Sequence, residues 1–427
     1  MPNQKTEKQT ELDFVADRAF IAMELIPNAA ESYDAKVRDI RDAIKDSDVV
    51  LDTNVLLLPY GAGSDSLIAI AKIFEKLAEE HRLHLPAQVI REFIKNRPTK
   101  IAELYKGISD RVSRIQSPQQ LSYPILEEIP DFREVNDTLK ELGELTKKLQ
   151  KSSSVLLKKI RSWEWNDPVS LAYKEKLPSS IILELPIDKE ATLAELKRRY
   201  DLSIPPGYKD SGKDDYGIGD FLIWKTILHI GSTNKKDMIF VSGEEKADWQ
   251  HRSDNAAFLP RYELLDEYRR FSNGRSLYII PLSKLLELLD VADTSVEEIK
   301  QEEARIIEAA TVQVICPYCE SSLTWRLGES VGSSEVPRCS NCDNPFHIHR
   351  TGVGVTVHKA AEDYRQRSQS KEKTVMILDC PACDEVVQVG LGVAPHSTAW
   401  TKCANCATTF PVHRRPDGTA FVGGTNG

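Results

Sequence analysis

The sequence predicts an α/β domain with a mostly parallel sheet, followed by two small β-rich units that contain all the cysteines. Three observations lead to this prediction. Short apolar runs that read as strands alternate with amphipathic helical stretches over much of residues 31–295. All eight cysteines lie beyond residue 315, in four Cys-x-x-Cys pairs. These pairs form two sets, and the second set repeats the spacing of the first.

The elements of the α/β pattern can be assigned in order along the chain. Helical stretches carry apolar residues three and four positions apart, and the strands are short runs rich in β-branched residues. The pattern predicts a helix over 31–45, a strand at 49–51, a helix over 65–80, a helix after Pro86 that buries Val89, Ile90, Phe93 and Ile94, a Gly- and Asp-rich loop at 207–219, a helix from Asp220, a strand at 238–241, a helix near 260–271, a strand at 277–280 and a helix over 283–290.

A long charged segment interrupts this alternation. Residues 99–200 contain helical stretches such as 133–161, broken by loops with proline, and they predict an inserted helical arm. The predicted domains are an N-terminal segment 1–30, an α/β domain over 31–98 and 201–295, the helical insertion 99–200, a linker helix 296–312, and two cysteine-rich units at 313–358 and 377–427 joined by a linker at 359–376.

The cysteine spacing predicts two metal sites of the same kind. The first set is Cys316, Cys319, Cys339 and Cys342, and the second set, 64 residues later, is Cys380, Cys383, Cys403 and Cys406. Four thiolates on two turns suit a structural zinc ion, which a unit of this size needs because it buries too little apolar surface to fold alone. Disulfides or a redox pair are the competing interpretation, but no signal peptide precedes the chain and no βαβ context surrounds the pairs. His349 and His413 are not expected to be ligands, because four sulfurs already fill each site.

Composition argues against a membrane protein and leaves nucleic-acid binding undecided. The 427 residues carry a formal net charge of −9, with 28% charged and 41% hydrophobic residues, which is ordinary for a globular protein. No apolar run reaches the roughly eighteen residues that a membrane span requires, so a cytoplasmic location is expected. The net charge gives no sign of nucleic-acid binding. Such binding would therefore depend on local basic patches.

Acidic residues stand where the predicted strands end. Asp52 follows the strand at 49–51, and Glu244 follows the strand at 238–241. In a parallel sheet both would project over the carboxyl edge, where chemistry collects. Glu92 and Asp220 lie on helices that could bring them to the same edge. Carboxylates without histidine or cysteine suit Mg²⁺ or Mn²⁺.

These segments resemble a known family. Asp52-Thr53-Asn54, the Val89–Phe93 stretch around Glu92, and Gly219–Trp224 around Asp220 are similar to the acidic signature of PIN-like nuclease domains. Three further stretches resemble its larger prokaryotic subgroup: Gly207–Asp210, Phe240–Trp249 and residues 277–290. The resemblance covers about 45–290 except the helical insertion. It implies a three-layer α/β/α fold and a Mg²⁺- or Mn²⁺-dependent phosphodiesterase, usually acting on RNA, with Asp52, Glu92, Asp220 and Glu244 as metal ligands.

Some site positions keep alternative interpretations. The family has an aspartate where this chain has Glu244, which is one methylene longer, and Asp248 is the alternative ligand. Asn54 is expected to orient Asp52 or a metal-bound water, and Thr53 or Asn54 to cap the chain that follows. The remaining candidates lie in two loops: Asp210, Asp214 and Asp215 as further ligands or turn formers, and Lys209 and Lys246 as phosphate contacts or solvated surface residues.

Two functions remain open from the sequence. The first is a nuclease, most readily an endoribonuclease in host defence or RNA control, with RNA favoured over DNA. The second is a non-catalytic regulator that binds nucleic acid or protein through a degenerate PIN-like domain. In either case the zinc ribbons would recruit a substrate or partner, and the arm or ribbons offer surfaces for a protein partner or a homo-oligomer. A haloacid-dehalogenase phosphatase is disfavoured because Asn54 stands where its second aspartate is needed.

Overall fold

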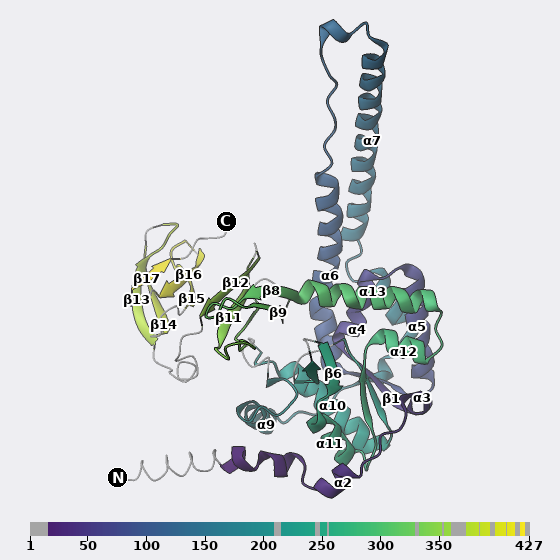
Figure 1. The fold of residues 1–427 in the computed structure, drawn as a ribbon, viewed down its shortest axis with the longest axis vertical. Helices are drawn as coiled ribbons and strands as arrows, with labels where there is room; N and C mark the ends of the chain where they lie inside the picture. The colour runs from purple at the N-terminus through teal and green to yellow at the C-terminus, as the bar shows by residue number, and fades with distance from the viewer. Residues whose placement is uncertain are drawn as a thin grey trace. The chain divides into compact units, whose positions relative to one another are not determined.

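The computed structural model describes residues 16–208, 215–243, 248–253, 256–328, 333–351, 354–359, 373–383, 385–392, 398–406, 408–414 and 419–422. The chain divides into two compact units, Met1–Ala309 and Ala310–Gly427. The first unit contains the α/β domain, and the second contains both cysteine sets (Figure 1).

Five parallel strands form the central sheet of the first unit. Their order is β3-β2-β1-β4-β7, and each neighbouring pair is parallel. The strands are β1 (Asp48–Leu51), β2 (Leu83–Pro86), β3 (Ile182–Leu183), β4 (Met238–Val241) and β7 (Leu277–Ile280). Since the chain leaves β1 towards β2 and later returns to add β4 on the opposite side, the strand order reverses at β1. Such a reversal opens a crevice at the carboxyl ends of the two strands.

Helices cover both faces of the sheet. Those on one side are α5 (Ser64–Glu79) and α12 (Leu282–Leu288), and those on the other are α10 (Ile218–Asn234) and α11 (Tyr262–Phe271) (Figure 1). All residues of β1 and β4 are buried in consequence, which explains why both strands read as continuous apolar runs. The predicted three-layer α/β/α arrangement is confirmed.

Smaller elements complete the first unit: α2 (Ala29–Tyr33), α3 (Ile40–Ala43), α4 (Thr53–Leu57), η1 (Leu58–Gly61), α8 (Pro168–Lys176), η3 (Ser179–Ile181), α9 (Lys189–Asp201), the hairpin β5 (Gln250–Ser253) and β6 (Ala256–Pro260), and α13 (Asp293–Ala310). The expected helix over 31–45 is wrong, because this stretch is divided between α2 and α3. The side chain of Asp39 accepts a hydrogen bond from the backbone N–H of Arg41 and starts a new helix at that point.

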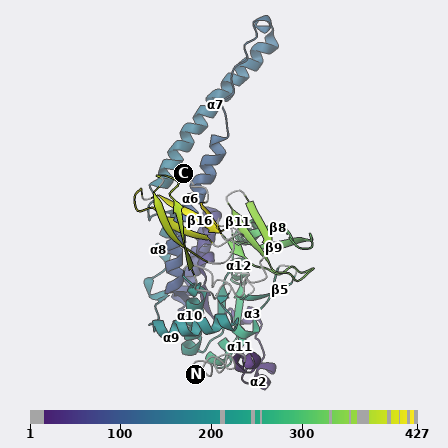
Figure 2. The ribbon, with the colours of Figure 1, turned by 90° about the vertical axis from the view of Figure 1, so that its left-hand side faces the viewer.

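A long helical hairpin projects from the domain (Figure 2). It consists of α6 (Ala87–Ser113), residues 114–129 with the short η2 (Pro124–Leu126), and α7 (Pro130–Arg161), and is called the α6–α7 hairpin below. The segment predicted as a helical insertion, 99–200, contains most of this hairpin. It also contains β3, which pairs with β2 and extends the central sheet.

A buried ion pair ties the base of the hairpin to the domain. The Nε atom of Arg97 on α6 donates to Asp167 Oδ2 at 2.6 Å, and the hydroxyl of Tyr60 donates to Asp167 Oδ1 at 2.7 Å. Burial disfavours the charged form of Asp167, but hydrogen bonds from Tyr60, Ser170 and Arg97 outweigh it and hold the pKa of this carboxyl below its usual value. The return of the chain from α7 is thereby fixed against α6.

The second unit contains two ribbons with the same topology. In each, a two-stranded hairpin precedes a three-stranded antiparallel sheet. The first ribbon has β8 (Thr311–Ile315), β9 (Ser322–Arg326), β10 (Ser334–Glu335), β11 (Phe346–Thr351) and β12 (Gly354–Lys359), and the second has β13 (Lys373–Asp379), β14 (Val386–Gly392), β15 (Thr398–Lys402), β16 (Thr409–Arg414) and β17 (Ala420–Val422). Across the described residues of both units, none of the helices has the length and apolar character needed to cross a membrane.

Candidate active site

Asp52 lies at the carboxyl end of β1, where the strand order reverses. It is the N-cap of α4, and its Oδ1 accepts from the backbone N–H of Thr53 at 2.7 Å. Its Oδ2 accepts from Asn54 Nδ2 at 2.8 Å and from Ser242 Oγ at 2.6 Å. The cap of this helix is therefore Asp52 itself, and not Thr53 or Asn54 as expected, while Asn54 orients the carboxylate.

Ser242 reaches Asp52 because β1 and β4 are paired in register. Leu51 is opposite Val241, so the residues that follow the two strands lie side by side. The backbone N–H of Gly243 also donates to Asn54 Oδ1 at 3.1 Å, which fixes the amide on the same edge. Sequence reasoning did not select Ser242, although its place directly after a buried strand is the same signal that selected Asp52.

Glu92 is held beside Asp52 from α6. Thr53 Oγ1 donates to Glu92 Oε2 at 2.8 Å, and Gln88 Nε2 donates to Glu92 Oε1 at 2.9 Å. Thr53, the residue after Asp52, thus links the two acidic positions. Gly219 makes room for this carboxylate, because a Cβ at that position would lie 2.3 Å from Glu92 Oε1.

Asp220 lies in the first turn of α10, next to Gly219. The helix begins after Gly217, whose φ of 62° is a left-handed conformation that favours glycine. Asp220 is therefore not the N-cap, and its charge lies near the positive end of the helix dipole. The indole N–H of Trp249 points to Asp220 Oδ2 at 3.5 Å, and Trp249 itself is buried against Phe240.

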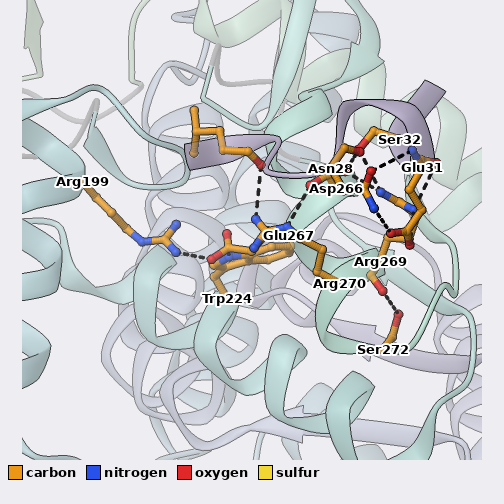
Figure 3. A network of polar contacts seen from close by, with 11 residues as sticks. Asn28, Glu31, Ser32, Arg199, Trp224, Asp266, Glu267, Arg269, Arg270 and Ser272 are labelled. Carbon is orange, nitrogen blue, oxygen red and sulfur yellow. Dashed lines mark hydrogen bonds and ion pairs between the residues drawn. The ribbon is translucent and has the colours of Figure 1, made fainter. Parts of the chain in front are cut away.

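A polar network holds α10, the helix that carries Asp220, against α11 (Figure 3). The indole of Trp224 on α10 donates to Glu267 on α11 at 2.8 Å, and Arg199 on α9 forms an ion pair with the same carboxylate. In the same network Asp266 accepts from Ser32 at 2.6 Å. Burial opposes ionisation of Asp266, yet hydrogen bonds from Arg269, Ser32 and Arg270 lower its pKa. The network therefore joins α10 to α11, and α11 in turn to α9 and α2.

Intermediate residues connect the three described acidic positions along one edge of the sheet. The three carboxylates do not form a tight cluster. Asp52 contacts Thr53, Thr53 contacts Glu92, and Glu92 borders Gly219 beside Asp220. Within the described part of the chain, the groups of at least three His, Cys, Asp or Glu ligand atoms lying within 4.8 Å of one another are the two cysteine sets.

The structure describes only some of the other candidate residues in the two loops. Glu244 and Asp210 lie outside the described residues, as do Asp214, Lys209 and Lys246. Asp215 Oδ1 accepts from the backbone N–H of Gly217 at 3.0 Å and shapes the turn before α10. Asp248 is buried, and its Oδ2 accepts from the backbone N–H of Gly207 at 2.8 Å. Asp248 therefore holds the start of the 207–219 loop in place.

A cavity of about 210 Å³ lies next to Gln88, the hydrogen-bond partner of Glu92. It lies between α6, α10 and the chain that follows β3, and Gln88, which bonds to Glu92, forms part of its wall. Arg91 and Lys225 line the same cavity, as do Glu184 and Asp188. The space beside the acidic edge therefore presents both cations and anions.

The cysteine sets have the geometry of four-thiolate zinc sites. A tetrahedron with Zn–S bonds of about 2.3 Å has S–S edges of about 3.8 Å, whereas a disulfide has an S–S distance of about 2.05 Å. The Sγ–Sγ distances are 3.8 Å for Cys316–Cys342, 3.6 Å for Cys319–Cys339, 3.6 Å for Cys380–Cys406 and 3.7 Å for Cys383–Cys403. All eight are free thiols, so both sets can hold zinc.

The repeat extends to the small cores of the ribbons. Phe346 and Phe410 are fully buried at equivalent positions, as are Leu327 and Leu391. His349 and His413 belong to neither cysteine set. Arg350 donates to the carbonyl of Gly328 at 2.7 Å, so this arginine braces its own ribbon.

The first unit thus combines an all-parallel sheet with acidic residues along one edge of it. The family model described as a PIN-like domain matches residues 48–264, which is half of the chain. The chain therefore belongs to the PIN-like domain family. Searches among curated proteins and among solved structures gave no match.

Proposed function

We propose that this protein is a Mg²⁺- or Mn²⁺-dependent nuclease that hydrolyses phosphodiester bonds, with RNA as its preferred substrate. The observation that carries the proposal is the placement of Asp52, Glu92 and Asp220 along one edge of the sheet at the strand reversal. Hydrogen bonds from neutral side chains orient them: Ser242 and Asn54 at Asp52, Thr53 and Gln88 at Glu92, and Trp249 at Asp220. Membership of the PIN-like family, whose domains are typically nucleases, supports the same class of reaction.

The donor set suits a hard divalent cation. Asp52, Glu92 and Asp220 offer only oxygen ligands, and Glu244 is proposed to complete the set. Such an ion, when bound, supplies a water of lowered pKa and neutralises charge on the phosphate. The chain's own residues keep the carboxylates in place: Ser242 and Asn54 hold one oxygen of Asp52, while Thr53 and Gln88 each hold one oxygen of Glu92. Arg91 and Lys225, which line the adjoining cavity and form ion pairs with Glu184 and Glu195, are the proposed contacts for a phosphate backbone.

Cleavage assays with single acid replacements test the proposal. Purified protein is incubated with labelled single-stranded RNA, single-stranded DNA and duplexes, in Mn²⁺, Mg²⁺ or EDTA. Asp52→Asn, Glu92→Gln and Asp220→Asn should each lower the cleavage rate by at least 100-fold, and EDTA should abolish it. Glu79→Gln is the matched control, because Glu79 is exposed at the end of α5, just before β2 begins at the opposite edge of the sheet.

The possible outcomes test the mechanism and the substrate preference separately. Cleavage that persists in EDTA, or in the Asp52→Asn protein, would refute the proposed mechanism. Faster cleavage of DNA than of RNA would refute the substrate preference and leave the metal chemistry standing. Calorimetric titration of Mn²⁺ provides a readout independent of activity, since each acid variant should bind Mn²⁺ more weakly than the Glu79→Gln control.

A binding-only regulator is the second candidate, and one observation favours it. The described carboxylates do not gather within 4.8 Å as the cysteines do, and Glu244 replaces the aspartate of the family pattern. Retention of RNA by the wild-type chain without cleavage in any metal would support this candidate.

The ribbons are proposed to bind two structural zinc ions and to recruit a substrate or partner. Their filled four-sulfur sites leave no open position for catalysis. A cytoplasmic role in host defence or RNA control fits a nuclease with added recruiting domains, and total zinc analysis of the purified chain should give two ions per chain.

A further inference from the structure

The α6–α7 hairpin presents an apolar stripe that its own partner helix does not cover. The face of α7 turned towards α6 buries Thr146, Ser153 and Ile160. A second row lies beside this face and is 40–61% exposed: Val135, Leu142, Leu145, Leu149 and Leu156. Four of these five recur every seven residues, which is the spacing of a helix–helix seam. The hairpin projects from the domain, so the stripe is not part of the main core (Figure 1).

The first half of α7 is mainly acidic, and the second half is basic. Residues 131–144 contain the acids Asp131, Glu134, Asp137, Glu141 and Glu144 against two bases, Arg133 and Lys140. Residues 145–161 contain no acid and six bases: Lys147, Lys148, Lys151, Lys158, Lys159 and Arg161. A parallel pair of such helices would set like charges against each other, whereas an antiparallel pair would set opposite charges against each other.

The stripe is also symmetric about the middle of α7. Val135 and Leu156 lie equally far from the point between Leu145 and Thr146, and so do Leu142 and Leu149. The helix itself, Pro130–Arg161, has the same midpoint. A two-fold axis through that point would therefore bring apolar residues onto apolar residues and the acidic half onto the basic half. An isologous dimer requires this kind of self-complementary surface.

Both ends of the hairpin carry exposed apolar groups that the same axis would bring together. At the tip, Ile125 is 90% exposed and Tyr123 is also exposed. At the base, Trp165 follows α7 and is 54% exposed. In an antiparallel pair the tip of one hairpin lies beside the base of the other, so these groups would meet.

We propose that the protein forms an antiparallel homodimer through α7, with Leu142 packing on Leu149 of the second copy and Glu141, at the edge of the stripe, facing Lys148 of that copy. The partner is a second copy of this chain because one surface supplies both halves of the apolar and charge match. This interface is independent of the proposed nuclease activity.

Sedimentation equilibrium of the full chain at micromolar concentration tests the proposal. Wild type should sediment with twice the mass of the chain. The double variant Leu142→Ser/Leu149→Ser should raise the dimer dissociation constant at least 100-fold, and it should fold because both side chains are exposed. The control Ile68→Ser/Leu193→Ser removes two equally exposed apolar groups from α5 and α9 and should leave the dimer intact.

Two further measurements fix the orientation. Lys148→Glu should weaken the dimer at least tenfold, and adding Glu141→Lys to the same chain should restore it. Zero-length carbodiimide cross-linking of mixed ¹⁴N and ¹⁵N chains should join Glu141 of one copy to Lys148 of the other. A monomeric wild type, or a dimer that survives Leu142→Ser/Leu149→Ser, would overturn the proposal. Loss of RNA binding on replacing Lys147, Lys148 and Lys151 in a monomeric chain would instead assign the basic half of α7 to nucleic acid.

Discussion

Different local contacts position Asp52, Glu92 and Asp220. Each contact involves a neighbouring residue that is small or uncharged. Asp52 receives hydrogen bonds from Asn54 and Ser242, and Glu92 receives them from Thr53 and Gln88. Gly219 contributes by lacking a side chain, which leaves the space that Glu92 Oε1 occupies. At this scale the site depends as much on these neighbours as on the acids themselves.

Replacing Gly219 by alanine should separate stability from function. The new Cβ would displace the end of the flexible Glu92 side chain rather than backbone, so folding should be unchanged or gain up to about 1 kcal/mol from helix propensity. The affinity for Mn²⁺ should fall roughly 10–100-fold, because a misplaced ligand weakens a metal site. Urea unfolding and calorimetric Mn²⁺ titration measure the two effects.

Gly107→Ala is the matched control for this prediction. Gly107 lies on α6, and its added Cβ would meet nothing within 4 Å. It should show the same small gain in stability with unchanged Mn²⁺ affinity. Equal Mn²⁺ affinities for the two alanine variants would mean that Glu92 is not a ligand.

At the scale of elements, the α6–α7 hairpin is the largest departure from a simple alternating fold. Its base depends on a buried pair, Arg97 and Asp167, whose side chains are 3% and 0% exposed. Tyr173 adds a hydrogen bond from its hydroxyl to the carbonyl of Leu56 at 3.1 Å, joining α8 to α4. The helix that follows the hairpin is thus joined to α4, which begins directly after Asp52.

The stability given by Asp167 should depend on pH in a definite direction. Its pKa is lowered in the folded chain, so its contribution is complete above the unfolded value near 3.9 and is lost as the pH falls through the lower folded value. Asp167→Asn leaves Arg97 buried without a counter-ion and should cost about 3–5 kcal/mol at pH 7. Urea unfolding between pH 7 and pH 3 should show this difference shrinking below about pH 4.

The exposed Asp110 on α6 supplies the comparison. Asp110→Asn should change the free energy of unfolding by less than about 0.5 kcal/mol throughout this range, as surface substitutions usually do. A destabilisation by Asp167→Asn that stays constant down to pH 3 would contradict the assignment of an ionised, hydrogen-bonded Asp167.

At the scale of the whole molecule, two units with different sources of stability share one chain. The first unit buries a large apolar core centred on the parallel sheet, whereas each ribbon buries only a few apolar side chains around its cysteines. A small core is insufficient by itself, so the ribbons should depend on metal while the α/β domain should not.

Removal of zinc should therefore unfold only the second unit. With a chelator selective for zinc over Mg²⁺, limited proteolysis followed by mass spectrometry should show new cuts within 310–427 and continued protection of the sheet in 1–309. Cys339→Ser should expose the first ribbon alone, whereas Ser340→Ala, at the neighbouring exposed position, should expose neither. New cuts within the central strands on zinc removal would show that the two units do not fold independently.

Much of the fold and part of the site could be predicted from local patterns. The alternation of apolar runs, the charged helical stretch at 133–161 and the equal spacing of the two cysteine sets are all encoded within short windows. Asp52 was recognisable because it ends a buried strand, and Glu92 because it borders an apolar helical stripe. The predicted helix over 31–45 was wrong because a local hydrogen bond overrides the helical periodicity. The Asp39 side chain caps a new helix, and this cap is favoured over a continuous helix.

The tertiary structure alone decided which of these residues meet. The hydrogen bond from Ser242 to Asp52 joins positions 190 residues apart, and it exists because β4 was added beside β1 in register. Gly219 and Glu92 are likewise brought together by two helices with no local relation in the sequence. Periodicity and spacing determine what each segment is, because they reflect the geometry of a single helix, strand or turn. Strand pairing and helix packing decide what each segment touches, since they depend on the burial of the whole core.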